Sequence, residues 1–418
     1  MNIIIGIDNI HDKIIELIKN CKDSFYWFAF NVNIHYSTKI YNAIMNALNN
    51  GKKVYIVTGG VNPYMNTINH PNCFIKNKIQ IGDQFHDIVL YAKKIGCIDI
   101  GNDYQFVNHT RFVYNGEQLI IGGTNCSARY NGTSFDTIKN QQFTWYEHGI
   151  LLNCPNNCDF FHDIYKKIDN DYKNIQKCEL NLKIDSQITL SNKKQYKYIL
   201  DCIDKSKKSI YIENQYFISH IKYNGVFSNN LICKCLVNRI KKAIRKDEDF
   251  HLTLIVSLYN YDECETVMNS IHVLTLLGLY DLRRYVNCDD NTFNKYVSVY
   301  IPRSKTKIVV HSKVYLFDDN HMLYSTANIC DRSFYKKGDI EIGFITNNTY
   351  DVCKIQSQLL KNIHDTKHLF RKFKFNKICI EDIQMCIAEY IRYCILNCIC
   401  VELLHKPIME INGNMLNI

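Results

Sequence analysis

The sequence contains little proline and no long apolar run. Five prolines among 418 residues leave no proline-rich linker. No uncharged apolar stretch approaches the roughly 20 residues that a membrane-spanning helix needs, and the densest one, 393–404, contains Glu402. The opening MNIIIGIDNIHDKII has no basic region before its apolar residues, and acidic residues interrupt it, so we expect no signal peptide. The sequence therefore predicts a cytoplasmic location without a transmembrane helix.

Paired zinc-binding cysteines are also missing. The 19 cysteines are scattered through helix-like and strand-like segments, and no two of them form a CxxC unit, which structural zinc sites commonly use. We therefore expect buried, reduced thiols, as is usual in a cytosolic compartment.

The rest of the composition is that of a globular protein. Hydrophobic residues make up 46% and charged residues 22% of the chain, and its length suits two lobes with a large buried core. The formal net charge of +9 indicates affinity for anionic surfaces, either lipid head groups or nucleic acid.

The same order of elements occurs twice along the chain. Apolar residues at helical spacing precede a strand-like segment from Ser24, and a second helix pattern that ends at Gly51 precedes another strand. The order returns in the second half, with strand-like segments from Ser209 and His251. We therefore predict an α/β fold of two similar lobes, each a mixed, mostly parallel β-sheet flanked by helices, related by a pseudo-two-fold axis.

One stretch of the second half carries a candidate active site. In HSKVYLFD, His311 and Lys313 are two residues apart in an alternating run, so both side chains leave the same face of a strand. Asp318 follows at the turn, and Asn328 lies on the far side of the hairpin. An imidazole can attack phosphorus or move a proton, while an ammonium and an amide can hold phosphate oxygens. The spacing therefore indicates phosphate chemistry.

These residues lead to a family resemblance. HSKVYLFD resembles the second HxKxxxxD signature of the phospholipase D superfamily, and STANICDRS followed by GDIEIGF resembles the block that trails it in eukaryotic-type members. YIENQYFIS resembles a block that precedes the second signature in the same enzymes. The resemblance implies two halves that each give one signature to a shared site. Polar residues at the end of a buried strand also point to a site wall, formed by Glu213, Asn214 and Gln215.

The first half contains a second copy of the signature, FVNHTRFVYNGEQLIIGGTNCSAR. His109 and Arg111 repeat the two-residue spacing, and Asn125 is the counterpart of Asn328. This copy departs from the family because Arg111 replaces lysine and because Asn115 stands nearest to the missing aspartate. A guanidinium can still fork onto phosphate oxygens, and the family's aspartate supports the motif more than the chemistry, so we expect catalysis. An inactive first half is the alternative.

An acidic residue trails each copy, Glu147 after the first and Glu341 after the second. A carboxylate behind each imidazole would hold one ring nitrogen as a donor and raise the basicity of the other. The alternative is that both are solvated strand residues.

The resemblance also implies a mechanism. His109 attacks phosphorus to form a covalent phosphohistidine, while His311 donates a proton to the leaving alcohol. Water activated by His311 then releases the product, and an alcohol in place of water would give head-group exchange. The residues expected to stabilise the phosphate oxygens are Arg111, Lys313, Asn125 and Asn328. No metal or other cofactor is implied.

The expected organisation has three parts: a first lobe, 1–180, with its signature at 109–125; a second lobe, 181–376, with its signature at 311–333; and a C-terminal helical segment, 377–418. A monomer would form a complete site.

We expect an enzyme that hydrolyses or exchanges the head-group phosphodiester of a glycerophospholipid such as phosphatidylcholine, associated peripherally with the membrane surface. Two alternatives remain. One is a membrane-associated factor with an inactive first site, which acts by binding. The other is a superfamily nuclease that cleaves nucleic acid, which the positive net charge permits.

Overall fold

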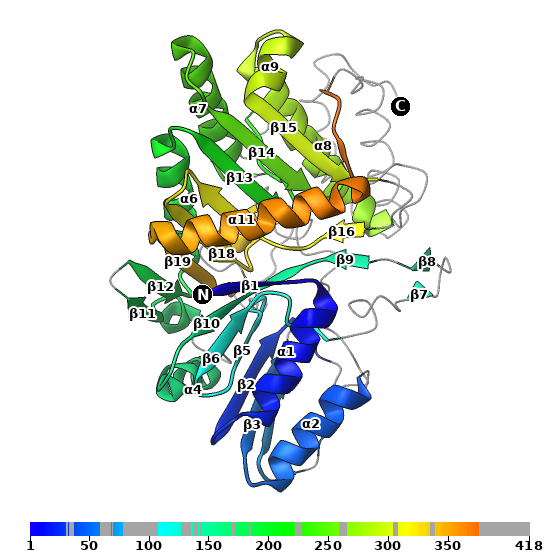
Figure 1. Ribbon diagram of the computed structural model, residues 1–418, viewed down its shortest axis with the longest axis vertical. Coiled ribbons are helices and arrows are strands. Elements are labelled where there is room, and N and C mark those ends of the chain that lie inside the picture. Colours follow the sequence, from blue (N-terminus) through cyan, green and yellow to red (C-terminus); the bar gives the residue numbers. More distant parts are fainter. Residues whose placement is uncertain are drawn as a thin grey trace, which may run out of the picture.

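Two large β-sheets with helices on their faces form the computed structural model (Figure 1). The structure describes residues 1–375 apart from 31, 33–36, 59–67, 69, 78–107, 127–134, 137–140, 143, 169–171, 184, 222–227, 259–265, 304–307 and 335–338. The predicted C-terminal helical segment therefore lies outside the described residues.

The first sheet, with its helices, is called the first half. Its strands lie in the order β1-β10-β6-β5-β2-β3-β4. They are β1 (Asn2–Ile5), β2 (Ser24–Ala29), β3 (Lys53–Thr58), β4 (Cys73–Asn77), β5 (Phe112–Tyr114), β6 (Gln118–Ile121) and β10 (His148–Asn153). The helices are α1 (Ile7–Lys19), α2 (Thr38–Asn49), α4 (Cys158–Lys167) and α5 (Tyr172–Ile175).

The second sheet, with its helices, is called the second half. Its strands lie in the order β11-β12-β19-β18-β17-β13-β14-β15-β20. They are β11 (Glu179–Lys183), β12 (Ser186–Thr189), β13 (Ser209–Asn214), β14 (His251–Val256), β15 (Val297–Pro302), β17 (Val314–Phe317), β18 (His321–Ser325), β19 (Gly343–Thr346) and β20 (Phe370–Lys372). The helices are α6 (Asn192–Lys205), α7 (Ile232–Lys246), α8 (Thr266–Val286), α9 (Asp290–Tyr296), α10 (Asp331–Phe334), α11 (Thr349–Thr366) and the 3-10 helix η5 (Lys367–Leu369).

The two sheets share one strand pattern. In the first sheet β2, β3 and β4 are parallel, and β5, β6 and β10 follow antiparallel on the other side of β2. In the second sheet β13, β14 and β15 are parallel, and β17, β18 and β19 follow antiparallel on the other side of β13. The predicted mixed α/β fold is confirmed, and β2 and β13 begin at the serines that mark the two copies in the sequence.

The expectation of mostly parallel pairing is wrong, because among the described strands antiparallel pairs outnumber parallel ones in both sheets. The physical reason lies in the connections. Helical crossovers place strands parallel, as α2 does between β2 and β3, whereas tight turns join antiparallel neighbours, as Gly116 does between β5 and β6 with φ +100°.

Local signals explain the ends of these elements. The α2 helix begins where the hydroxyl of Ser37 accepts a hydrogen bond from the backbone N–H of Ile40. It ends just before Gly51, whose φ of +76° suits a residue without a side chain. In the second half, α8 and α9 lie in the connection between β14 and β15.

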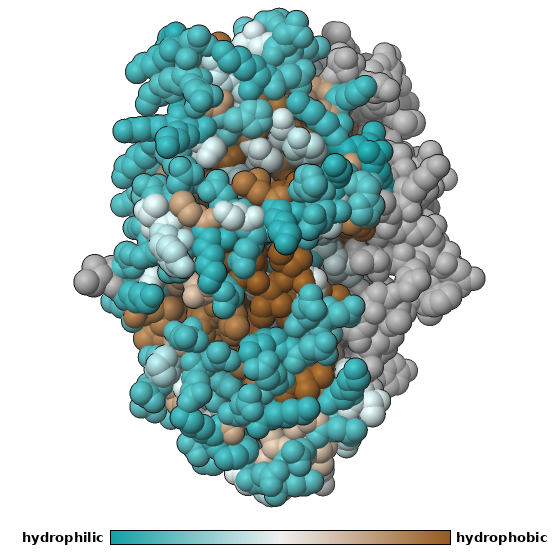
Figure 2. Space-filling model, in the orientation of Figure 1, coloured by the Kyte–Doolittle hydropathy of each residue, from teal (hydrophilic) through white to brown (hydrophobic). Residues whose placement is uncertain are grey.

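The two halves meet along a short two-stranded parallel sheet. One strand is β9 (Thr144–Tyr146) from the first half and the other is β16 (Ile308–Val310) from the second. A hydrophobic core cluster also joins them, with members such as Tyr146, Ile150 and Val310. Figure 2 shows a largely hydrophilic face on which apolar residues gather at the middle, near β1 and α11, where the halves meet. A further short hairpin, β7 (Phe135–Asp136) with β8 (Gln141–Gln142), lies outside both sheets.

Within the described ranges, no helix is both long and apolar enough to cross a bilayer.

Candidate active site

The two signature histidines lie where each half contacts the other. His109 precedes β5, and its backbone N–H donates to the carbonyl of Ile340, 3.0 Å away, in the second half. His311 follows β16, and its backbone N–H donates to the carbonyl of Tyr146, 2.9 Å away, in the first half. Each histidine is therefore positioned by backbone contacts with the other half.

The His109 ring is held by a buried carboxylate. Its Nδ1 lies 2.9 Å from both oxygens of Glu341. When Glu341 is ionised its carboxylate only accepts, so we assign the proton to Nδ1 of His109 and a lone pair to Nε2. The hydroxyls of Thr326 and Ser333 each donate to Glu341 over 2.6 Å. These two hydroxyls thus fix the Glu341 carboxylate, and through it the His109 ring.

The His311 ring has the equivalent arrangement with Glu147, which accepts a hydrogen bond from its Nδ1. The indole of Trp145 packs edge-on against the same imidazole, with ring centroids 4.4 Å apart and an interplanar angle of 87°. The proton is again assigned to Nδ1, so Nε2 is the ring nitrogen that can exchange a proton with a substrate.

The carboxylates are exchanged between the halves. The sequence predicts a carboxylate behind each imidazole, and the structure places one there, but Glu341 of the second half serves His109 and Glu147 of the first half serves His311. Neither half therefore contains a complete histidine–carboxylate pair by itself.

The guanidinium of Arg111 lies between the two imidazoles. Its Nη2 donates to Nε2 of His109, and its Nη1 lies 3.4 Å from Nδ1 of His311. Its Nε is buried and has no hydrogen-bond partner among the residues that the structure describes. A buried guanidinium N–H without a partner is costly, and an anionic ligand would satisfy it.

Lys313 lies in the same cluster and is 2% exposed. Its Nζ donates to the backbone carbonyl of His311 and to Oε1 of Gln215, 3.3 Å away. Burial and the charge of Arg111 hold the pKa of Lys313 well below its ordinary value, although Glu147 and Glu341 oppose the shift.

Burial and the two cations also control the histidines. Burial, then the charges of Arg111 and Lys313, hold the pKa of His109 and the pKa of His311 well below the ordinary value of 6.5. Both rings are therefore neutral near pH 7 in the absence of a ligand. Burial raises the pKa of Glu147, and it raises the pKa of Glu341 to about 7.

The two asparagines expected to hold phosphate are both buried. The backbone carbonyl of Asn125 accepts from Nε2 of His11 over 2.9 Å, which ties it to α1. The backbone N–H of Asn328 donates to Ser333 over 3.1 Å, and its side-chain oxygen has no partner within the described part of the chain. Their contact with phosphate remains a prediction.

The turn residues of the two signatures lie at the far ends of their hairpins and serve the backbone. The carboxylate of Asp318 accepts from the backbone N–H groups of Lys207, Lys208 and Ser209, at 2.7 to 3.1 Å. Lys207 and Lys208 precede β13 and Ser209 begins it, so Asp318 joins the hairpin to the start of that strand.

Asn115 has a related task in the first half. Its side-chain oxygen accepts from the backbone N–H groups of Glu117 and Gln118, and its amide donates to the carbonyl of Leu17 over 3.2 Å. The missing aspartate of the first signature is thus replaced by a residue that pins its hairpin to α1.

The three residues predicted as a site wall differ in their roles. Gln215 touches Lys313. Asn214 instead braces the chain, with its amide donating to Tyr315 over 2.8 Å and its oxygen accepting from the backbone of Ile329. Glu213 is fully buried and faces Tyr211, Ser312 and His148.

Sequence reasoning missed several residues that hold the site. Thr326 and Ser333 position Glu341, and Ser312 and His148 contact Glu213. Thr326 and Ser333 belong to the STANICDRS block, which offered a signal. His148 directly follows Glu147, and nothing in its neighbourhood in the sequence marks it.

One cluster among the described residues has the spacing of a cation site, namely His109, Asp339 and Glu341. Asp339 is ion-paired with Arg332 over 2.7 Å, and Glu341 accepts from three donors. The cluster therefore has the character of a hydrogen-bonded network.

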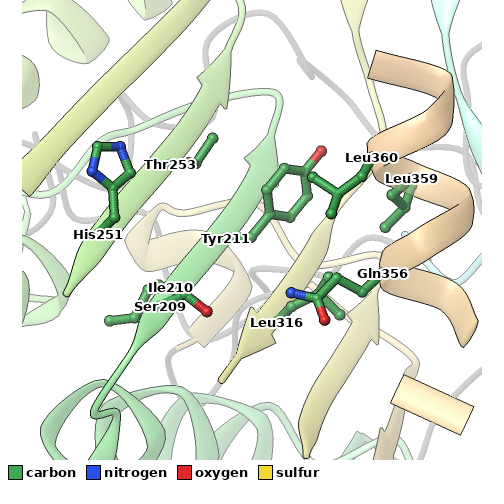
Figure 3. Close-up of a pocket in the computed structure, with 9 residues that line it drawn as sticks. All are labelled: Ser209, Ile210, Tyr211, His251, Thr253, Leu316, Gln356, Leu359 and Leu360. Atoms are coloured by element: carbon green, nitrogen blue, oxygen red, sulfur yellow. The ribbon is translucent and has the colours of Figure 1, made fainter. Parts of the chain in front are cut away.

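A separate pocket of about 130 Å³ lies between α11 and the second sheet (Figure 3). Leu316, Leu359 and Leu360 give it an apolar wall, and none of the signature residues lines it. Tyr211 is one of its lining residues and extends from β13 toward α11.

Comparisons with known proteins agree on one family. A family model described as phospholipase D matches residues 133–275. Phospholipase D of Phytophthora infestans is 28% identical over 166 residues, which are 35% of this chain and 9% of that protein. Phospholipase D1 of Homo sapiens is 28% identical over 170 residues, which are 36% of this chain and 16% of that protein. The similarity thus spans only about a tenth to a sixth of these relatives.

A solved structure resembles nearly the whole chain. The phosphatidylserine synthase of Haemophilus influenzae Rd KW20 matches with a TM-score of 0.59 and 14% identity, over 94% of this chain and 93% of that one. At this identity the likeness shows the fold alone.

Proposed function

Because the chain belongs to the phospholipase D superfamily, we propose that it is a phosphodiesterase of the phospholipase D type, acting on the head-group phosphodiester of a glycerophospholipid. One observation carries the proposal. Two imidazoles, each held at Nδ1 by a carboxylate, lie on either side of the Arg111 guanidinium. A nucleophile, a proton donor and a phosphate-binding cation are therefore together in one buried cluster.

In the first step, Nε2 of His109 attacks phosphorus. The bond from phosphorus to the leaving alcohol oxygen breaks, and that oxygen takes a proton from Nε2 of His311. The Nδ1–H of His109 keeps its hydrogen bond to Glu341, whose carboxylate stabilises the positive charge that develops on the ring. Arg111 moves its hydrogen bond from His109 to the phosphate oxygens.

In the second step, His311 removes a proton from water, and the water oxygen attacks phosphorus. The bond between phosphorus and His109 breaks, which restores both rings to their starting states. An alcohol can replace water, and the product is then an exchanged phosphodiester.

The electrostatics fit these roles. His311 must be protonated to act as an acid, yet burial, Arg111 and Lys313 keep its pKa low. A bound phosphodiester carries a negative charge that offsets both cations and raises the pKa of His311. Substrate binding therefore favours protonation of His311, which then donates this proton to the leaving group. His109 stays neutral in the free enzyme.

The relatives support a lipid substrate, since their names are those of phospholipases D. Membrane association would then be peripheral. The placement of His109 and Arg111 in one network with His311 favours an active first half over a factor that only binds.

The test measures choline release from phosphatidylcholine vesicles with ethanol present, and quantifies phosphatidylethanol. Wild type is expected to form both products, and His109→Asn and His311→Asn to form neither. Hydrolysis of single-stranded DNA with no choline release would move the assignment to a nuclease. Vesicle binding without turnover of either substrate would contradict the enzymatic proposal.

A further inference from the structure

A second buried ionic group lies behind the catalytic cluster. Glu213, at the end of β13, is 0% exposed. One oxygen of its carboxylate accepts from the hydroxyl of Tyr211. The other accepts from the hydroxyl of Ser312 and lies 3.2 Å from Nε2 of His148, which is 1% exposed. The Glu213–His148 contact joins the second half to the first.

Two of the three partners of Glu213 are chain neighbours of functional residues. Ser312 directly follows His311, and His148 directly follows Glu147, the carboxylate that holds His311. These residues form a closed ring. The side chain of His311 contacts Glu147, and Glu213 contacts both Ser312 and His148. The two remaining links are the peptide bonds between residues 311 and 312 and between residues 147 and 148. A shift at any contact therefore changes the distance between His311 and Glu147.

We propose that Glu213, Ser312 and His148, called the brace, are positioning residues that set the approach of Glu147 to His311. This inference rests on the proposed function, because it assigns the brace to the same reaction. The brace holds the proton donor in place through its neighbours and does not touch the substrate.

The two histidines are supported differently. The Glu341 carboxylate is fixed directly, because the hydroxyls of Thr326 and Ser333 donate to it. Among the described contacts no hydroxyl donates to Glu147. Glu147 is instead held through the backbone beside it, where the N–H of Gly6 donates to its carbonyl over 3.0 Å, and the ring of the next residue, His148, rests against Glu213.

The burial of the brace supports a functional role. A fully buried carboxylate costs free energy unless it is paired and hydrogen-bonded. Burial by itself would raise the pKa of Glu213, but His148 and the hydroxyls of Ser312 and Tyr211 lower it below its ordinary value. Directional hydrogen bonds from the hydroxyls of Tyr211 and Ser312 fix the Glu213 carboxylate within the second half. Its contact with His148 across the boundary is a close approach of 3.2 Å without hydrogen-bond geometry.

The test is a double-mutant cycle on turnover of bis(p-nitrophenyl) phosphate. Glu213→Gln is expected to lower kcat by about 10- to 100-fold and to leave KM within about twofold, since the brace does not contact the substrate. In a Glu147→Gln background the same change is expected to cause no further loss, because it acts through Glu147.

Glu248→Gln is the matched control. Glu248 is also ion-paired, with Arg239 over 2.7 Å, but at the end of α7 and outside the brace, so kcat is expected to stay unchanged. If Glu213→Gln does not fold, Ser312→Ala replaces it, and Ser312→Thr, which keeps the hydroxyl, is expected to restore turnover.

A second readout does not depend on activity. In protein labelled with ¹⁵N-histidine, the Nδ1–H resonance of His311 is expected to shift in Glu213→Gln. The proposal would be overturned if Glu213→Gln lowered kcat by the same factor in the Glu147→Gln background as in the wild type. An unshifted His311 resonance would also overturn it. If wild type cleaves no phosphodiester, the proposed function fails, and the resonance alone decides the inference.

Discussion

Replacing Asp318 with alanine is expected to destabilise the fold and to leave turnover nearly unchanged. In the wild type its carboxylate accepts from the backbone N–H groups of Lys207, Lys208 and Ser209. Water can reach two of these donors, because both lysines are exposed, so each lost bond costs about 0.5 to 1 kcal/mol. Asp318 also has φ +50°, where alanine is strained by about 1 kcal/mol. The free energy of unfolding should therefore fall by about 3 kcal/mol.

Urea unfolding measures this loss, and kcat on a chromogenic phosphodiester measures catalysis. Asp318→Asn keeps one acceptor oxygen and tolerates the left-handed backbone, so it is expected to lose only about 1 kcal/mol. A folded Asp318→Ala protein of wild-type stability whose kcat falls more than about 100-fold would refute the reasoning, since it would make this carboxylate part of the chemistry.

The first signature offers the reverse experiment. Asn115 donates its amide to the carbonyl of Leu17, which a carboxylate cannot do. Asn115→Asp restores the family's residue, yet it is expected to destabilise the protein by about 1 to 2 kcal/mol and to leave kcat unimproved. A gain in kcat would show that the departure from the family had impaired the site.

Three further predictions concern charge and packing. The folded-state pKa of Glu341 is raised to about 7. As pH rises from about 4.5 to 7, the free energy of unfolding of the wild type should therefore fall by about 3 kcal/mol relative to that of Glu341→Gln. The same pH dependence in both proteins, measured by urea unfolding, would contradict this. Arg111→Lys keeps the charge, but an ammonium cannot fork onto two phosphate oxygens as a guanidinium does, so kcat/KM should fall about 10- to 100-fold; full activity would mean that the fork is not used. Gly122→Ala places a Cβ 2.5 Å from Oη of Tyr324 and should lower the free energy of unfolding, measured by chemical denaturation, by about 2 kcal/mol or more. Gly51→Ala has nothing within 4 Å of the new Cβ, so only backbone strain should destabilise it.

The sequence by itself determined the repeated elements and the residue types of the site. The helix patterns and the strand starts at Ser24 and Ser209 follow from periodicity, which is a local property of the chain, and the structure has strands from those residues. The spacing of His311 and Lys313, and of His109 and Arg111, likewise needed no tertiary knowledge.

The sequence predicted the direction of the strands less accurately than their positions. The helical crossovers indicated parallel strands correctly at β2-β3 and β13-β14. The antiparallel majority arises from returning hairpins and from strands that join a sheet from far along the chain, such as β1 with β10. Such pairings depend on which edges are free after collapse, and periodicity does not record that.

Only the tertiary structure decided which groups act on one another. Glu341 is 232 residues from His109, and Glu147 is 164 residues from His311. The brace joins Glu213 to His148 across the same boundary. Contacts at such separations form because two sheets bury a common core, and the pKa values at the site follow from that burial and from the cations it brings together. The sequence supplies the reactive groups, and the packing of the halves decides how they are paired.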